Sequence, residues 1–121
     1  MHAMEHRWGQ RVPVCQRVQL ACRGQDSSAS ILRDASISGA FVQTGLQPRL
    51  FSEVEIAMQV GGETLRISAR VVRSERAGIG VEWNHLASAA VIVLLDEYSF
   101  PSHLKRETLQ GAGTRRTRSC P

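Results

Sequence analysis

The sequence has few features of membrane, secreted or disulfide-rich proteins. No apolar run is long enough to cross a membrane, and the first residues, MHAMEHRWGQR, lack the apolar core of a secretory signal. The three cysteines form no CxxC pair. Because their number is odd and no signal peptide precedes them, we expect reduced thiols and a cytoplasmic protein. Cys15 and Cys22 would face opposite sides of one strand, which disfavours a disulfide or a shared metal ion between them.

Sequence patterns typical of catalysis are also missing. There is no Ser/His/Asp order, no paired carboxylates and no cluster of metal ligands, and the glycine pairs lack phosphate-loop spacing. His85 and His103 have no partner at metal-ligand spacing. We therefore expect no enzymatic activity, no metal and no cofactor.

The positive charge is concentrated at one end of the chain. The net charge is +4, but residues 1–103 contain ten basic and ten acidic residues, whereas residues 104–121 contain five basic and one acidic. This basic segment is rich in Gly, Thr and Ser and has no apolar periodicity, which predicts a disordered tail. Nucleic-acid binding is therefore the less favoured interpretation, and it would be salt-sensitive and depend on the tail arginines.

Apolar residues alternate at period two through most of the chain, which predicts half-buried strands. Gly61-Gly62 is the clearest two-residue hairpin signal, and RSERAG (73–78) is expected to turn the chain. The expected strands are 11–23, 29–36, 39–44, 54–60, 63–72 and 79–83.

Near residue 90 the period changes to that of a helix. The apolar stripe consists of Val91, Leu94, Leu95 and Tyr98, with Ser88 as the expected N-cap and Pro101 as the stop. Six strands followed by one helix predict an all-β fold, an antiparallel β-barrel with one C-terminal helix packed on it.

Two short polar motifs are the candidate binding residues. Asp34-x-Ser36-x-x-Gly39 lies between the second and third expected strands, and Arg7-x-x-x-Arg11 precedes the first. Each has a purely structural interpretation, because Asp, Ser and Gly stabilise turns and surface arginines are usually solvated. Barrel connectivity can bring the two segments together.

With GIGVEW (78–83) as a third element, the sequence resembles the PilZ family of cyclic-di-GMP receptor domains over roughly residues 6–100. The resemblance implies a six-stranded barrel and a bacterial second-messenger receptor that signals to a downstream protein. It divides the chain into an N-terminal arm (1–11), a barrel with its helix (12–103) and a basic tail (104–121). A PilZ-like interaction module that binds no nucleotide is the alternative.

The chemistry of the ligand fits these residues. The planar guanidinium groups of Arg7 and Arg11 suit phosphate oxygens and the O6/N7 edge of guanine, and the Asp34 carboxylate can accept from guanine N1–H and N2–H. Ser36 can donate or accept near the purine or a phosphate. Gly39 is expected to allow close backbone approach and a left-handed conformation.

Two neighbours of the arginine motif are further candidates. Trp8 lies between the two arginines and could stack on a base or pack on the barrel. His6 stands where many members of the family have Arg, so the number of ligand molecules bound stays open.

Overall fold

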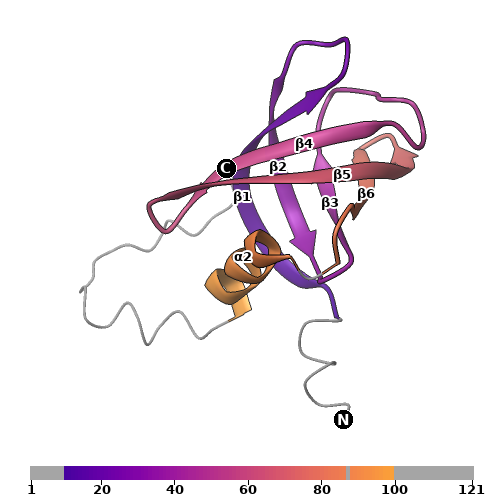
Figure 1. Cartoon of the computed structure of the whole chain (residues 1–121). Coiled ribbons are helices and arrows are strands. Elements are labelled where there is room, and N and C mark those ends of the chain that lie inside the picture. Colours follow the sequence, from indigo (N-terminus) through magenta and orange to yellow (C-terminus); the bar gives the residue numbers. More distant parts are fainter. Residues whose placement is uncertain (1–9, 87, 100–121) are drawn as a thin grey trace.

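The computed structural model describes residues 10–86 and 88–99, in which six strands and one helix are found. The strands form a closed barrel in the order β1-β2-β3-β6-β5-β4, and all neighbouring strands are antiparallel (Figure 1). The elements are β1 (Val12–Cys22), β2 (Ser28–Ala35), β3 (Gly39–Gln43), β4 (Glu53–Val60), β5 (Glu63–Glu75), β6 (Gly78–Trp83) and α2 (Ala89–Ser99). The predicted six-stranded antiparallel barrel with one C-terminal helix is confirmed.

The two hairpins of the second half differ in how well the sequence predicts them. Gly61 and Gly62 have φ values of 57° and 84° and join paired residues Val60 and Glu63, so this predicted two-residue turn is confirmed. The turn predicted within 73–78 is found, but it is shorter than expected: β5 continues to Glu75, which pairs with Gly78, so only Arg76 and Ala77 form the turn. The exposed polar residues before it belong to the end of a long strand.

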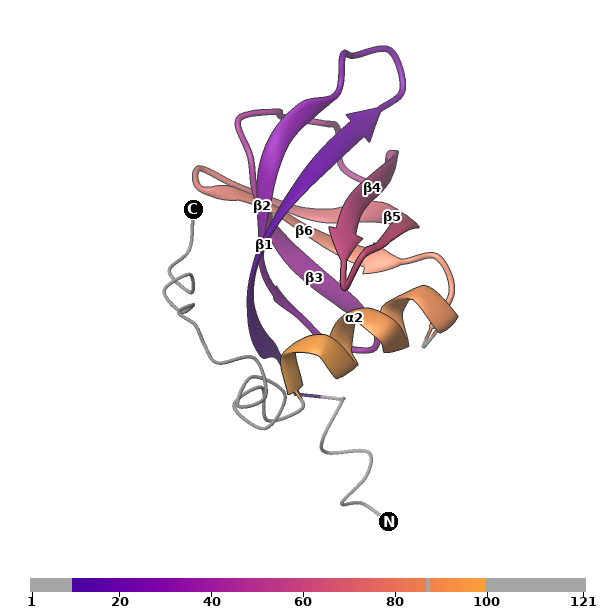
Figure 2. The ribbon, with the colours of Figure 1, turned by 90° about the vertical axis from the view of Figure 1, so that its left-hand side faces the viewer.

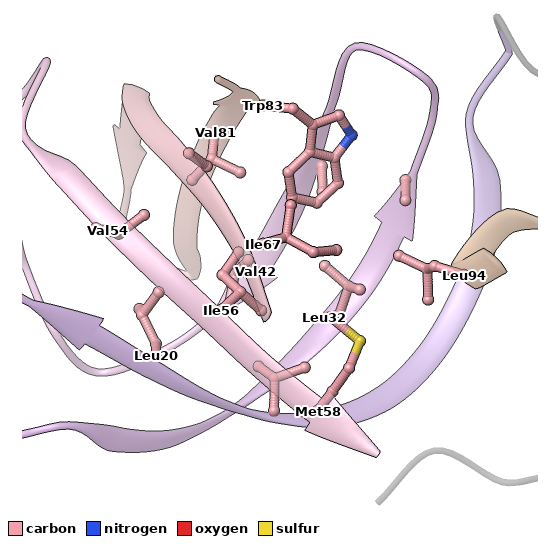
Figure 3. Packing of buried hydrophobic residues seen from close by; sticks show 14 of the residues in the cluster. Leu20, Leu32, Val42, Val54, Ile56, Met58, Ile67, Val81, Trp83 and Leu94 are labelled. Carbon is pink, nitrogen blue, oxygen red and sulfur yellow. The ribbon is translucent and has the colours of Figure 1, made fainter. Parts of the chain in front are cut away.

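The barrel interior is filled by the apolar residues that alternate along each strand. Leu20, Leu32, Val42 and Ile56 are fully buried and come from four different strands. Figure 3 shows these side chains converging between the strands. Close packing of this kind gives the barrel a rigid wall on which surface residues are held in place.

Helix α2 covers one end of the barrel, opposite the end that carries the β1–β2 loop (Figures 1 and 2). Ser88 caps the helix, since its carbonyl accepts from Ile92 N at 2.9 Å and its hydroxyl from Val91 N at 3.4 Å. Val91, Leu94 and Leu95 are fully buried, as the helical stripe predicts. Figure 3 shows Leu94 pointing into the barrel. The expected stop at position 101 lies outside the described residues.

The contact between β1 and β4 that closes the barrel is short. It extends over four residue pairs, from Gln19 opposite Ala57 to Cys22 opposite Val54. Beyond it, the side chain of Gln16 joins the strands by donating from Nε2 to the Gln59 carbonyl at 3.0 Å. The hydroxyl of Tyr98 in α2 donates to Oε1 of the same glutamine at 2.8 Å. One amide therefore connects β1, β4 and the helix.

The two cysteines of β1 differ in their state. Cys15 is disulfide-bonded, which differs from the expectation of reduced thiols. Cys22 is free and buried, and its burial raises the pKa of the thiol. The helix seen in the described part of the chain is too short to traverse a lipid bilayer.

Candidate functional site

The structure brings two of the predicted site residues into direct contact. Nη1 of Arg11 donates to Oδ1 of Asp34 at 2.7 Å, across 23 residues of sequence. Both side chains are accessible, with 47% of Arg11 and 34% of Asp34 exposed. An ion pair at the surface can exchange its partners for those of a ligand at little cost, because water already screens it.

The barrel register places this pair. Asp34 lies near the end of β2, opposite Pro13 on β1 and Phe41 on β3. Arg11 comes directly before β1, so it lies beside the same end of β2. Irregularities between Pro13 and Gln16 on β1 and between Leu32 and Asp34 on β2 interrupt the regular pairing here. Bulges of this kind change the direction of side chains and are common beside functional sites.

Ser36 has a structural role in the loop between β2 and β3. It is buried, with 4% of the residue exposed, and its Oγ accepts from Ser38 N at 3.2 Å and lies 3.2 Å from Ser38 Oγ. Its backbone N–H donates to the Gly39 carbonyl at 2.8 Å. The hydroxyl predicted to meet the purine or phosphate therefore stabilises the turn between β2 and β3.

Trp83 ties this loop to the last strand, a contact that sequence reasoning missed. The buried indole donates from Nε1 to the Ser36 carbonyl at 2.8 Å, and the backbone N–H of Trp83 donates to the Ser38 carbonyl at 2.9 Å. GIGVEW and the Asp-Ser-Gly motif thus form one hydrogen-bonded unit. The presence of Trp, whose N–H needs a partner when buried, was the available signal.

Of the two predicted reasons for Gly39, close backbone approach is found and a left-handed conformation is not. Its φ is not positive, so the expected left-handed conformation is wrong. A Cβ added to Gly39 would instead overlap the carbonyl oxygen of Val81 on β6. The close approach at this position is that of a neighbouring strand, and it sets the distance between the motif loop and β6.

Three of the predicted binding residues, His6, Arg7 and Trp8, lie outside the described residues. Two exposed arginines of β2 and β5 have partners within the barrel surface: Arg33 donates to Gln43 Oε1 at 3.1 Å, and Arg70 pairs with Glu82 at 3.2 Å. In residues 10–86 and 88–99, no group of three or more His, Cys, Asp or Glu could hold a metal ion.

The fold is a small closed antiparallel barrel that carries an exposed Arg–Asp pair beside the loop between β2 and β3. Among known families, the PilZ domain family matches residues 5–100. The chain therefore belongs to the PilZ domain family, whose members are regulatory receptor domains and in general not enzymes.

Solved structures show the same fold. The PilZ domain of CeSA from a cellulose-synthesizing bacterium superimposes with a TM-score of 0.61 at 21% identity, covering 74% of this chain and 94% of that one. The Bacillus subtilis inhibitor of motility, MotI/DgrA, matches with a TM-score of 0.56 at 14% identity, covering 84% of this chain and 50% of that one. No curated protein matches the sequence significantly.

Proposed function

We propose that the protein is a non-enzymatic receptor for cyclic-di-GMP. The Arg11–Asp34 pair carries this proposal, because it presents guanidinium donors and a carboxylate acceptor side by side on an exposed surface. A guanidinium has five N–H donors, so Arg11 can bind a phosphate or the guanine O6/N7 edge. Asp34 can accept from guanine N1–H and N2–H. The two groups satisfy one another without ligand and would exchange that contact for the nucleotide.

The proposed output is a change of the N-terminal arm, read by a downstream protein. Arg11 is the root of the arm that carries Arg7, and its side chain already contacts the barrel. A ligand that engages both arginines would fix the backbone between them. The proposed compartment is the cytoplasm, where a receptor for an intracellular messenger would meet its ligand.

The alternative is an interaction module that binds no nucleotide. One observation favours it: Ser36 and Gly39 both have structural roles within the barrel. Titration calorimetry with cyclic-di-GMP, with GTP and cyclic-di-AMP as controls, decides between them. Saturable heat with cyclic-di-GMP supports the receptor and gives its stoichiometry, whereas no heat at high micromolar ligand supports the alternative.

Asp34 is expected to supply the preference for guanine. Asp34→Ala should lower the affinity for cyclic-di-GMP about tenfold or more, because a charge-assisted hydrogen bond is lost. Binding of cyclic-di-AMP, whose adenines lack that donor pair, should change less. Calorimetry on both ligands measures the difference, and Asp26→Ala, at an exposed position in the β1–β2 loop, is the matched control. If the affinities for the two ligands fall equally, Asp34 stabilises the end of β2 and does not select guanine.

Ordering of the arm is expected to accompany binding. Fixing a residue costs about 1–2 kcal/mol of backbone entropy, so ligand contacts can order only a short segment. Saturating cyclic-di-GMP should therefore slow amide hydrogen exchange from Trp8 to Val12 and leave Met1 to Ala3 and the tail after Gly111 unchanged. Arg11→Ala under the same conditions is the control. Unchanged exchange from Trp8 to Val12, together with measured binding, would reject the arm mechanism and keep the receptor.

A further inference from the structure

A hollow of about 700 Å³ lies on the outside of the barrel, over β1, β2, β4 and β5. The strand registers explain its shape. Gln19 lies opposite Ala29 on β2 and opposite Ala57 on β4, and Ala57 lies opposite Arg66 on β5. Because the two alanines carry only a methyl group, the surface is low on both sides of Gln19 and rises at Arg66.

The hollow has a positive rim. Arg17 and Arg66 line it, and none of its lining residues is acidic. Among residues 10–86 and 88–99, Arg17 takes part in no ion pair. Arg66 pairs with Glu55 at 3.6 Å, but both side chains are about half exposed or more and Glu55 does not line the hollow. Such a pair is weak and leaves the guanidinium able to bind another anion.

Of the three glutamines that line the hollow, two already have side-chain hydrogen-bond partners. The amide of Gln16 is bonded to Gln59 and Tyr98, and Gln59 Nε2 donates to Thr64 Oγ1 at 2.6 Å. No hydrogen bond of the Gln19 side chain is found in the described chain, so its amide can serve a ligand. Apolar surface comes from Ile31, opposite Arg17 on β2, and from the two alanines. The hollow is therefore lined by two guanidinium groups, a side-chain amide and an apolar surface.

The hollow is distinct from the site described above. Neither Arg11 nor Asp34 lines it. Ile31, the lining residue of β2 nearest to Asp34 in sequence, is three residues away, which is about 10 Å along a strand. The two sites lie on the same outer wall but present different residues.

We propose that this hollow is a second ligand site, which binds a small organic anion whose phosphate or carboxylate lies between Arg17 and Arg66. Guanidinium groups form paired hydrogen bonds with either anion. The apolar wall would hold the body of the ligand, and the volume is within the range of small-molecule sites. The proposal does not depend on cyclic-di-GMP binding at Arg11 and Asp34.

Three probes test it by NMR on isotope-labelled protein. Adenosine monophosphate offers phosphate on an aromatic body, indole-3-acetate offers carboxylate on one, and inorganic phosphate offers charge alone. We expect saturable shifts of the Arg17 and Arg66 Nε–H and Gln19 side-chain signals with at least one organic probe, and the better probe identifies the anion. Arg17→Gln should weaken that binding about tenfold. Arg23→Gln, in the exposed β1–β2 turn, is the matched control and should leave it unchanged.

Three results would overturn the second site. One is the absence of saturable shifts with either organic probe. Another is that inorganic phosphate binds as tightly as the organic probes, which would show that the arginines attract any anion and that the apolar wall takes no part in binding. The third is that Arg11→Ala weakens binding of the probe as strongly as Arg17→Gln does, which would make the hollow part of the first site. Cyclic-di-GMP titration of Arg17→Gln separates the two proposals, since its affinity there should equal that of the unmodified protein.

Discussion

Arg11→Ala is expected to lower the affinity for cyclic-di-GMP about 10- to 150-fold without unfolding the protein. Hydrogen bonds to charged groups contribute about 1.5–3 kcal/mol, which corresponds to this range of affinity. The ion pair with Asp34 is exposed, so its own contribution to the free energy of unfolding is about 1 kcal/mol or less. Calorimetry measures the affinity and circular dichroism checks the fold.

The matched control for this prediction is Arg23→Ala, which removes an exposed arginine from the opposite end of β1. Its affinity should equal that of the unmodified protein. A folded Arg11→Ala protein with unchanged affinity would remove Arg11 from the ligand site. If both variants weaken binding equally, the effect comes from total charge rather than from the position of Arg11.

Gly39→Ala is expected to lower the free energy of unfolding by about 2–4 kcal/mol. The added Cβ would overlap the Val81 carbonyl oxygen, which belongs to the backbone of β6 and cannot move without breaking strand pairing. The displaced loop also carries Ser36, whose contacts with Trp83 would be strained. Urea denaturation followed by tryptophan fluorescence measures the loss.

Two other glycines make this test specific. At Gly45 nothing lies within 4 Å of an added Cβ, so Gly45→Ala should change stability by about 0.5 kcal/mol or less. At Gly78 an added Cβ would overlap the Val42 carbonyl oxygen, so Gly78→Ala should cost about as much as Gly39→Ala. Wild-type stability of Gly39→Ala would mean that the β3–β6 approach is not the reason for this glycine.

The fold was predictable from the sequence where it depends on residues that are close together in the chain. The face on which a side chain lies depends on alternation along its own strand, so the inward residues of β1 and β4 follow directly from the sequence. The length of β5, in contrast, is not determined by the residues of that strand alone. Its last residues are polar and exposed, and they form a strand only because Glu75 pairs with Gly78.

The site was predictable in its residue types but not in their roles. The distance between Arg11 and Asp34 depends on the register of β1 against β2, which the order of motifs along the chain does not determine. Ser36 and Gly39 have side-chain properties that suit a turn as well as a ligand, so the motif alone cannot separate the two. The contact from Trp83 to Ser36 depends on the direction of one buried N–H.

The barrel is completed by two contacts between strands that are distant in sequence. β4, β5 and β6 follow one another through two-residue turns, whereas the nearest partners are 32 residues apart in the β1–β4 contact (Cys22 and Val54) and 35 residues apart in the β3–β6 contact (Gln43 and Gly78). Closing these longer loops costs more chain entropy than forming the hairpins, which favours formation of both contacts after the hairpins. Until then, the edge from Gln19 to Cys22 has no partner and can pair with another chain. The four residue pairs between β1 and β4 thus protect the folded protein against edge-to-edge aggregation.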